Sequence, residues 1–293
     1  MLRIEAGPRT LRRLGDGMDQ RPYEHFTVVP LSPTIGAEIS GVDLSCPLDD
    51  AVHAELHRAL LEWKVVFFRD QWIAGEQHRD FARRWGELEV HPFLPAGDVP
   101  EIARFDRGTE NQGYENIWHS DVSWREIPSM GSVLRALQVP PVGGDTLWAD
   151  MGAAYDGLPY ELKGEIDGLT AVHDWGHSFG RAMAPDKVAS MREQFPPVEH
   201  PVVRTHPETG RKTLYVNEIF VSHIVGLASD ESDALLDRLC RQARVPEYQC
   251  RFRWTAGSLA FWDNRATQHY AVSDYAPQRR VMERATIIGD RPA

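Results

Sequence analysis

Short apolar segments separated by glycine and proline dominate this chain, and they constrain its fold more than any other feature. Such segments are typical of β-strands joined by turns. Residues 140–145, PPVGGD in one-letter code, can only form a turn or loop between two of them. We expect strands at residues 65–68, 132–138, 146–149, 200–205, 213–217, 258–262, 266–272 and 281–288.

Helices are fewer and do not alternate regularly with these strands. Apolar residues three and four positions apart predict helices over residues 49–63, 76–85 and 230–243. Many strands with a few helices packed outside them indicate a mainly β fold with flanking helices, as in a sandwich or barrel. A doubly wound parallel sheet is disfavoured, because it needs helices between successive strands.

No repeat or long linker divides the 293 residues, so residues 26–293 are expected to form a single domain. Residues 1–25 are rich in arginine and lack an apolar stretch, which predicts a flexible N-terminal tail. An organelle-targeting peptide is the alternative, although the acidic residues in this segment disfavour it. Residues 150–200 have weak periodicity and several glycines and prolines, which favours a mobile lid insertion.

Composition excludes several classes of partner. Lys and Arg number 32 against 43 Asp and Glu, and the net charge of −11 argues against nucleic-acid binding. No uncharged stretch approaches the ~20 apolar residues of a membrane span. The 3 cysteines have no C-x-x-C spacing, which favours a reducing, cytoplasmic location. A small anionic substrate stays open, because a few buried arginines can create a positive pocket on an acidic protein.

One short motif carries metal-binding potential. His119 and Asp121 lie two positions apart, so on an extended segment both side chains point to the same side and can share a metal ion. A second histidine from another strand would complete a triad of two histidines and one carboxylate, which is typical of non-haem Fe(II) oxygenases. The alternative for His-x-Asp alone is a chance surface pair.

His269 is the candidate for the second histidine. Among the 12 histidines it lies inside an apolar, aromatic segment near the C-terminus, whereas the others fall on polar helix faces, beside prolines or in loops. The alternative is a core histidine whose hydrogen bonds are satisfied within the protein.

Two arginines follow on the last predicted strand. Arg280 and Arg284 are four residues apart and therefore share a face of that strand. Buried guanidinium groups need anionic partners, and no carboxylate on the strand faces the same way. A small dicarboxylate would suit two bidentate arginines. Structural ion pairs with Asp263 or Asp145 are the alternative.

With these residues in view, the sequence resembles the taurine and alkylsulfonate dioxygenase family, the TauD/TfdA group of Fe(II)- and 2-oxoglutarate-dependent oxygenases. The resemblance rests on residues 35–44, 118–122, 143–148, 200–207 and 262–265, and on the spacing between His269 and Arg280. It implies a double-stranded β-helix, or jelly roll.

The resemblance also implies a set of ligands. Fe(II) would be held by His119, Asp121 and His269, and O₂ and 2-oxoglutarate would be consumed together. Thr146 and Arg280 would bind the far carboxylate of 2-oxoglutarate, with Arg284 near its keto-acid end and near the acidic group of the substrate. The residues expected to bind substrate are His91, Glu115, Val122, Phe179, Phe220 and Arg284.

The expected reaction hydroxylates a small sulfonate such as taurine next to sulfur, and releases sulfite and an aldehyde with succinate and CO₂. Leu94 and Glu115 depart from the family's taurine-binding pattern, so alkyl sulfates or carboxylated phenoxy ethers are alternative substrates. A jelly-roll binding protein without catalysis is a further alternative. A homo-oligomer, dimer or tetramer, also stays open.

Overall fold

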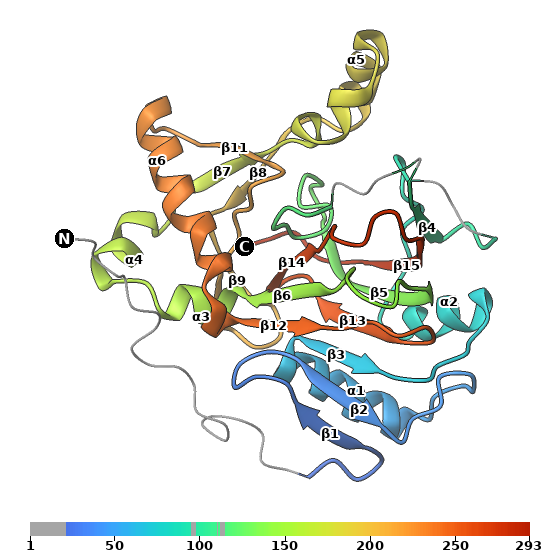
Figure 1. Cartoon of the computed structure of the whole chain (residues 1–293). Coiled ribbons are helices and arrows are strands. Elements are labelled where there is room, and N and C mark those ends of the chain that lie inside the picture. Colours follow the sequence, from blue (N-terminus) through green and yellow to red (C-terminus); the bar gives the residue numbers. More distant parts are fainter. Residues whose placement is uncertain (1–21, 95–97, 110, 112–114) are drawn as a thin grey trace.

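The computed structural model describes residues 22–94, 98–109, 111 and 115–293 (Figure 1). Most of the expected N-terminal tail, residues 1–21, lies outside the described residues. The helices are α1 (Asp50–Trp63), α2 (Gly75–Arg83), α3 (Met151–Asp156), α4 (Tyr160–Ile166), α5 (Pro185–Gln194) and α6 (Ser229–Cys240). The strands are β1 (Thr27–Pro30), β2 (Ala37–Ser40), β3 (Val65–Phe68), β4 (Ile102–Arg107), β5 (Ser129–Gln138), β6 (Thr146–Asp150), β7 (Thr170–His173), β8 (Val198–Pro201), β9 (Val203–Thr205), β10 (Lys212–Leu214), β11 (Val221–Ile224), β12 (Gln249–Phe252), β13 (Leu259–Asp263), β14 (Thr267–Ala271) and β15 (Arg280–Ile288).

Two facing sheets form the centre of the molecule. The larger has the strand order β1-β2-β3-β13-β5-β15-β4, and the smaller has the order β12-β6-β14. All pairs are antiparallel except β2 with β3. Further short sheets, β11-β7-β8 and β10-β9, lie outside these two. The arrangement is a double-stranded β-helix, the fold that the sequence resemblance predicts.

Strand β3 shows why a strand at the centre of the fold consists only of apolar residues. Val65 and Phe67 belong to the apolar cluster between the two sheets, together with Trp148 of β6. Val66 and Phe68 point to the opposite side, into the cluster beneath the first two helices. Because both faces of the strand are covered, all four residues are buried, and the usual alternation of apolar and polar residues is lost.

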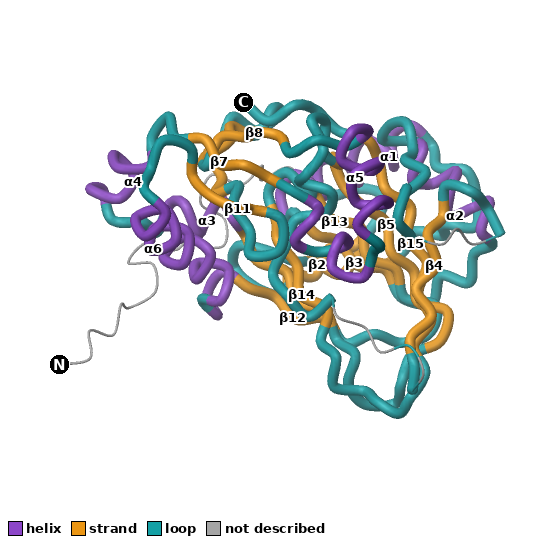
Figure 2. The backbone as a smooth tube through the Cα atoms, turned by 90° about the horizontal axis from the view of Figure 1, so that it is seen from above, coloured by secondary structure: helices purple, strands orange, loops and turns teal. Residues whose placement is uncertain are grey.

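Helices α1 and α2 cover the outer face of the large sheet. The buried side chains of α1, among them Leu56 and Leu60, recur three and four residues apart and join the same cluster as Phe81 of α2. Helices α3, α4 and α6 gather at the other end of the molecule in both views (Figures 1 and 2). No helix in the described ranges is long and apolar enough to cross a membrane.

The predicted elements largely match this structure. The three predicted helices correspond to α1, α2 and α6, and each predicted strand contains or overlaps an observed one. The single strand expected at 200–205 is divided into β8 and β9, because the Val202 amide bonds to Leu169 and its carbonyl to Tyr215. Residues 150–200 contain helices α3, α4 and α5, of which α5 buries no residue. Short helices, and helices with few apolar residues, leave little periodicity in the sequence, which explains why these were not predicted.

Candidate active site

The His-x-Asp segment is fixed by backbone pairing and by one asparagine. His119 and His269 pair across an isolated bridge and exchange both backbone hydrogen bonds, at 3.1 and 2.8 Å. The side chain of Asn264 accepts from the Asp121 amide at 2.7 Å and donates to the Asp121 carbonyl at 2.9 Å. Val122 then turns the chain with a φ of 44°, a conformation that β-branched residues rarely adopt. This framework directs the side chains of residues 119 and 121 toward residue 269.

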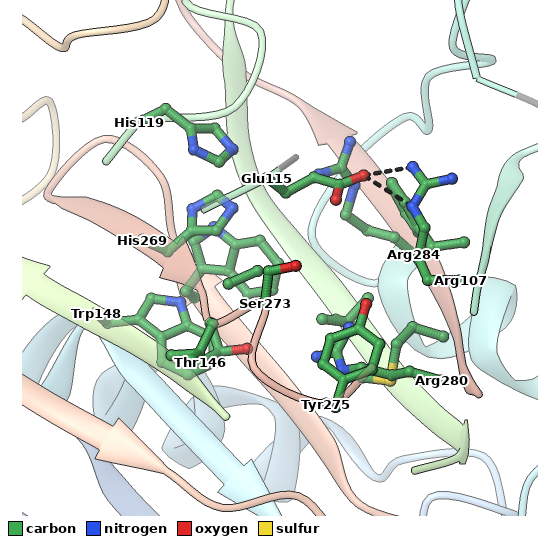
Figure 3. Close-up of a pocket in the computed structure, with 16 residues that line it drawn as sticks. Arg107, Glu115, His119, Thr146, Trp148, His269, Ser273, Tyr275, Arg280 and Arg284 are labelled. Atoms are coloured by element: carbon green, nitrogen blue, oxygen red, sulfur yellow. Dashed lines mark hydrogen bonds and ion pairs between the residues drawn. The ribbon is translucent and has the colours of Figure 1, made fainter. Parts of the chain in front are cut away.

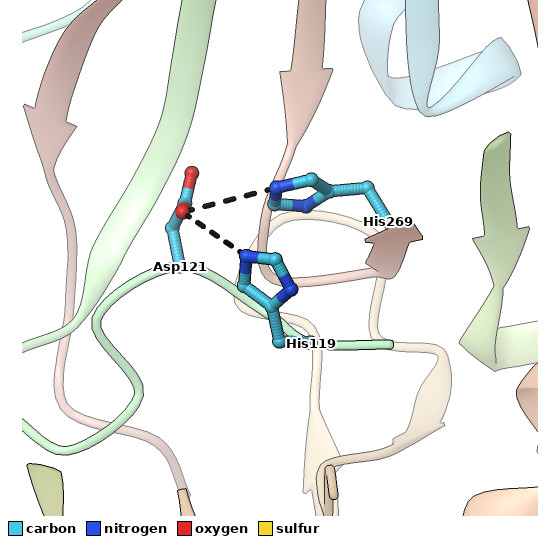
Figure 4. Close-up of side chains that lie close together, drawn as sticks. All are labelled: His119, Asp121 and His269. Atoms are coloured by element: carbon cyan, nitrogen blue, oxygen red, sulfur yellow. Dashed lines mark ion pairs between the residues drawn. The ribbon is translucent and has the colours of Figure 1, made fainter. Parts of the chain in front are cut away.

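The three predicted metal ligands converge in the structure (Figure 4). Nε2 of His119 and Nε2 of His269 each lie 3.9 Å from Oδ1 of Asp121, and the two imidazole centres are 4.2 Å apart. Nδ1 of His119 donates to the Ile117 carbonyl at 2.7 Å, so in the neutral ring Nε2 has its lone pair available. All three side chains are buried.

The protonation states also suit a metal. Burial lowers the pKa of His119, and it lowers the pKa of His269 to about 3, so both rings are neutral at pH 7. Burial alone would raise the pKa of Asp121, but Arg284 and the two histidines outweigh it and hold that pKa below its usual range. Two neutral imidazoles and an ionised carboxylate are the forms that coordinate a divalent metal, so the donor set fits Fe(II).

A first cavity, here called the inner chamber, extends from the two histidines along β15 (Figure 3). It has an empty volume of about 650 Å³ including its mouth. The predicted 2-oxoglutarate residues Thr146, Arg280 and Arg284 line it. Its other lining residues are Phe105, Arg107, Glu115, His119, Leu134, Trp148, Trp262, His269, Ala271, Val272, Ser273, Tyr275 and Met282.

The far end of the inner chamber fits a carboxylate. Arg280 is buried, and its Nε donates to the Gly144 carbonyl at 3.1 Å, whereas its Nη2 has no hydrogen-bond partner among the described residues. Thr146 Oγ1 accepts from the Trp254 indole at 3.0 Å, so its own proton is available to a further acceptor. An unpartnered guanidinium nitrogen beside a free hydroxyl proton is a binding site for an anionic oxygen.

A second cavity, the outer chamber, is lined by the candidate ligands His119 and Asp121 and has an empty volume of about 520 Å³. It contains every residue expected to bind substrate. The rings of Phe179 and Phe220 stack with centres 6.2 Å apart, and His91 lies 5.8 Å from Phe179. The lining residues are His91, Leu94, Phe105, Glu115, His119, Asp121, Val122, Ser178, Phe179, Ile219, Phe220 and Arg284.

The two arginines do not form the structural ion pairs that the sequence left open as the alternative. Neither pairs with Asp263 or Asp145, whose carboxylates bind Arg265 and Arg251. The sequence predicted that Arg284 has no carboxylate partner within the protein. Instead, its Nη1 donates to Oδ1 of Asp121 at 2.6 Å. This contact joins residues 163 positions apart, so the pattern along one strand could not predict it.

Glu115 also has a partner that the sequence did not indicate. The expected alternatives were a substrate ammonium group or solvent, but its Oε1 accepts hydrogen bonds from Nε and Nη2 of Arg107 (Figure 3). Arg107 comes from β4, an edge strand whose mixed sequence gave no signal. Tyr275, Phe105 and Arg107 are lining residues that the sequence analysis missed, and no local pattern marks them.

Comparisons with known proteins identify the family of this chain. The sequence profile of the "Taurine catabolism dioxygenase TauD, TfdA family" matches residues 27–286. The alkylsulfatase of Acinetobacter baylyi is 38% identical over 92% of this chain and 87% of its own length. The alpha-ketoglutarate-dependent sulfate ester dioxygenase of Pseudomonas putida is 39% identical, over 90% of both chains.

A solved structure gives the same result. The crystal structure of a taurine dioxygenase from Burkholderia xenovorans superposes with a TM-score of 0.79 at 40% identity, and it covers 92% of this chain and 91% of that one. The profile match over residues 27–286 contains all three candidate ligands. This chain therefore belongs to the TauD/TfdA family of dioxygenases.

Proposed function

We propose that this protein oxidises small organic sulfates and sulfonates that carry an uncharged, apolar chain, with Fe(II), O₂ and 2-oxoglutarate as its cofactor and cosubstrates. The observation that carries this substrate class is the lining of the outer chamber. Its apolar side chains, Leu94, Val122, Phe179, Ile219 and Phe220, surround a space into which Arg284 brings a positive charge. Such a chamber suits an anionic head group joined to a hydrocarbon chain.

In this proposal the ligands and the inner chamber prepare the cofactors. His119, Asp121 and His269 hold the iron, which supplies oxygen activation coupled to the oxidative decarboxylation of 2-oxoglutarate. Arg280 and Thr146 bind the far carboxylate of 2-oxoglutarate and so orient its keto-acid end toward the metal ligands. The aromatic lining, which includes Trp148, keeps water away from this end.

The outer chamber positions the substrate. Burial, with the nearby charge of Arg284, lowers the pKa of His91 to about 3, so the ring is neutral at pH 7. Nδ1 of His91 accepts from the Phe93 amide at 3.1 Å, which leaves Nε2–H as a donor. His91 and Arg284 together bind the sulfate or sulfonate oxygens, and the apolar wall holds the adjacent carbon near the metal.

The products differ between substrates. Hydroxylation of the carbon that bears a sulfate ester gives a hemiacetal sulfate, which breaks down to an aldehyde and inorganic sulfate. The same step on a sulfonate gives an aldehyde and sulfite. Taurine has less support, because the outer chamber offers an ammonium group only two carboxylates among its described lining residues. One is the candidate ligand Asp121, and the other is Glu115, which Arg107 occupies.

The test measures substrate-stimulated succinate formation with Fe(II), 2-oxoglutarate and O₂. Butyl sulfate, hexyl sulfate, butane-1-sulfonate, taurine and a phenoxyacetate are supplied in parallel, and sulfate and sulfite release are measured. We expect succinate and sulfate in equal amounts from the alkyl sulfates. His269→Ala should abolish the signal, whereas His223→Ala, at an exposed histidine, should not. Succinate stimulated by the phenoxyacetate alone, or by none of the compounds, would contradict the proposal.

A further inference from the structure

The ion pair between Arg107 and Glu115 occupies the place where the two chambers meet. Glu115 lines both chambers, and Arg107 lines the inner one. Figure 3 shows the two side chains facing each other, with dashed lines from Arg107 to one carboxylate oxygen. The pair is only partly exposed, at 13% for the arginine side chain and 29% for the glutamate.

Neighbouring contacts fix both members of this pair. The Glu115 carbonyl accepts from the Ala271 amide at 3.3 Å, two residues after the ligand His269. The guanidinium of Arg107 lies 5.9 Å from the centre of the Phe105 ring, and that of Arg284 lies 5.2 Å from the same ring. Phe105 therefore packs beside both cations and lines both chambers.

Glu115 is the carboxylate that a cationic substrate group would need. Apart from the candidate ligand Asp121, it is the only carboxylate among the described lining residues of either chamber. A substrate with an ammonium group at the end of its chain needs such a carboxylate, because a buried cation without an anion is strongly unfavourable. Nε and Nη2 of Arg107 already donate to Oε1 of Glu115, and this ion pair offsets the charge that would attract an ammonium group.

We propose that the Arg107–Glu115 ion pair is a specificity determinant, which makes the protein select anions with an uncharged chain and reject zwitterions such as aminoalkyl sulfonates. The inference rests on the proposed function for the location of the substrate. The ion pair adds a reason why the protein would distinguish two substrates of nearly equal shape. The alternative is that the ion pair only supports the fold or the 2-oxoglutarate site, in which case its loss would affect both compounds equally.

The experiment uses propane-1-sulfonate and taurine, which differ by a methyl group in place of an ammonium group. Dissociation constants are measured by anaerobic calorimetry on the full chain loaded with Fe(II) and 2-oxoglutarate. We expect the wild-type protein to bind propane-1-sulfonate at least ~10-fold more tightly than taurine. Arg107→Met should release Glu115 and reduce this ratio at least ~10-fold. The double variant Arg107→Met/Glu115→Gln should restore it.

Two further variants separate the effect of the lost charge on the binding ratio from any effect of misfolding. Arg107→Gln repeats the change with a polar side chain, and Glu115→Gln alone should leave the ratio at or above the wild-type value, because Arg107 then repels ammonium. The inference is wrong if the wild-type protein does not discriminate, if the Arg107 variants keep the wild-type ratio, if the double variant keeps the Arg107→Met ratio, or if Glu115→Gln lowers the ratio. Tight binding of propane-1-sulfonate without succinate formation would instead contradict the proposed function, and the binding ratios would still decide the role of the ion pair.

Discussion

The side chain of Asn264 forms hydrogen bonds with both backbone polar groups of Asp121. It thereby positions a candidate metal ligand, although Asn264 is not itself a candidate ligand. Its amide oxygen accepts from the Asp121 N–H at 2.7 Å, and its amide nitrogen donates to the Asp121 carbonyl at 2.9 Å. The same nitrogen donates to Ser129 Oγ at 2.8 Å. All these groups are buried, so water cannot substitute for the side chain of Asn264.

Replacing Asn264 should therefore weaken the metal site. Asn264→Ala leaves the buried Asp121 N–H without a partner and its carbonyl with only the 3.4 Å bond from Ser129 Oγ, which should lower the free energy of unfolding by about 2 kcal/mol. Metal affinity should fall roughly 10–100-fold, as for other residues that orient a ligand. Urea unfolding and Co(II) titration measure the two effects. Asn111→Ala, at an exposed asparagine, is the control, and unchanged Co(II) affinity in Asn264→Ala would refute the positioning role.

Arg280 and its neighbour Arg279 allow a matched comparison. Arg280 is buried in the inner chamber, whereas Arg279 is exposed and pairs with Asp106 at 2.6 and 2.8 Å. Arg280→Gln should raise the KM for 2-oxoglutarate roughly 10–100-fold, because a charge-assisted hydrogen bond is lost, and should leave Co(II) affinity unchanged. Arg279→Gln should alter neither value. Equal effects of the two substitutions on KM would show that Arg280 does not bind the carboxylate of 2-oxoglutarate.

Gly144 should be required for the placement of Arg280. Its φ is +71°, and a Cβ there would lie 3.2 Å from Cδ and 3.3 Å from Nε of Arg280. Gly144→Ala should cost about 1–2 kcal/mol of stability from the left-handed backbone and should also raise the KM for 2-oxoglutarate. Gly210→Ala is the control, because its φ is +68° and nothing lies within 4 Å of the added methyl group. A normal KM in Gly144→Ala would contradict this prediction, whatever its stability.

His78 should make stability depend on pH. Burial, with the charge of Arg135, lowers its pKa from 6.5 to about 3, and its Nε2 bonds to the Val133 carbonyl at 2.9 Å. Between these values the unfolded chain binds a proton that the folded protein does not, so stability falls as the pH drops below 6.5. From pH 7 to pH 5 the wild-type protein should lose about 2 kcal/mol relative to His78→Gln, because all other titrating groups are shared. Urea unfolding of both metal-free proteins at each pH measures this difference, and a constant difference would be the contrary result.

The sequence was sufficient to predict those features that depend on local periodicity. The apolar spacing in α1 and the short apolar run of β3 each mark one element, and the structure confirms both. The aromatic surroundings of His269 mark one candidate ligand, which the structure places beside His119 and Asp121. The prediction that His269 lies beside His119 depended on the family resemblance. Spacing alone does not say which strands face each other.

Interactions between elements could not be predicted from the sequence. Strand β4 mixes apolar and charged residues without regular alternation, so neither the strand nor the pairing of Arg107 with Glu115 was predicted. Arg284 was assigned to a small anion, with Asp263 or Asp145 as the alternative partner, because its contact with Asp121 joins two segments that are distant in the sequence. Such contacts follow from how the sheets are assembled rather than from the residues next to each partner.

The bridge between His119 and His269 has a consequence for how relatives of this protein can diverge. Backbone pairing sets the spacing of these two candidate ligands, and Phe179 and Phe220 come from segments outside the two facing sheets. Insertions, deletions and substitutions in those segments can therefore reshape the recognition of new compounds while the iron chemistry is inherited unchanged. Swapping these segments between relatives should accordingly transfer substrate preference as a unit.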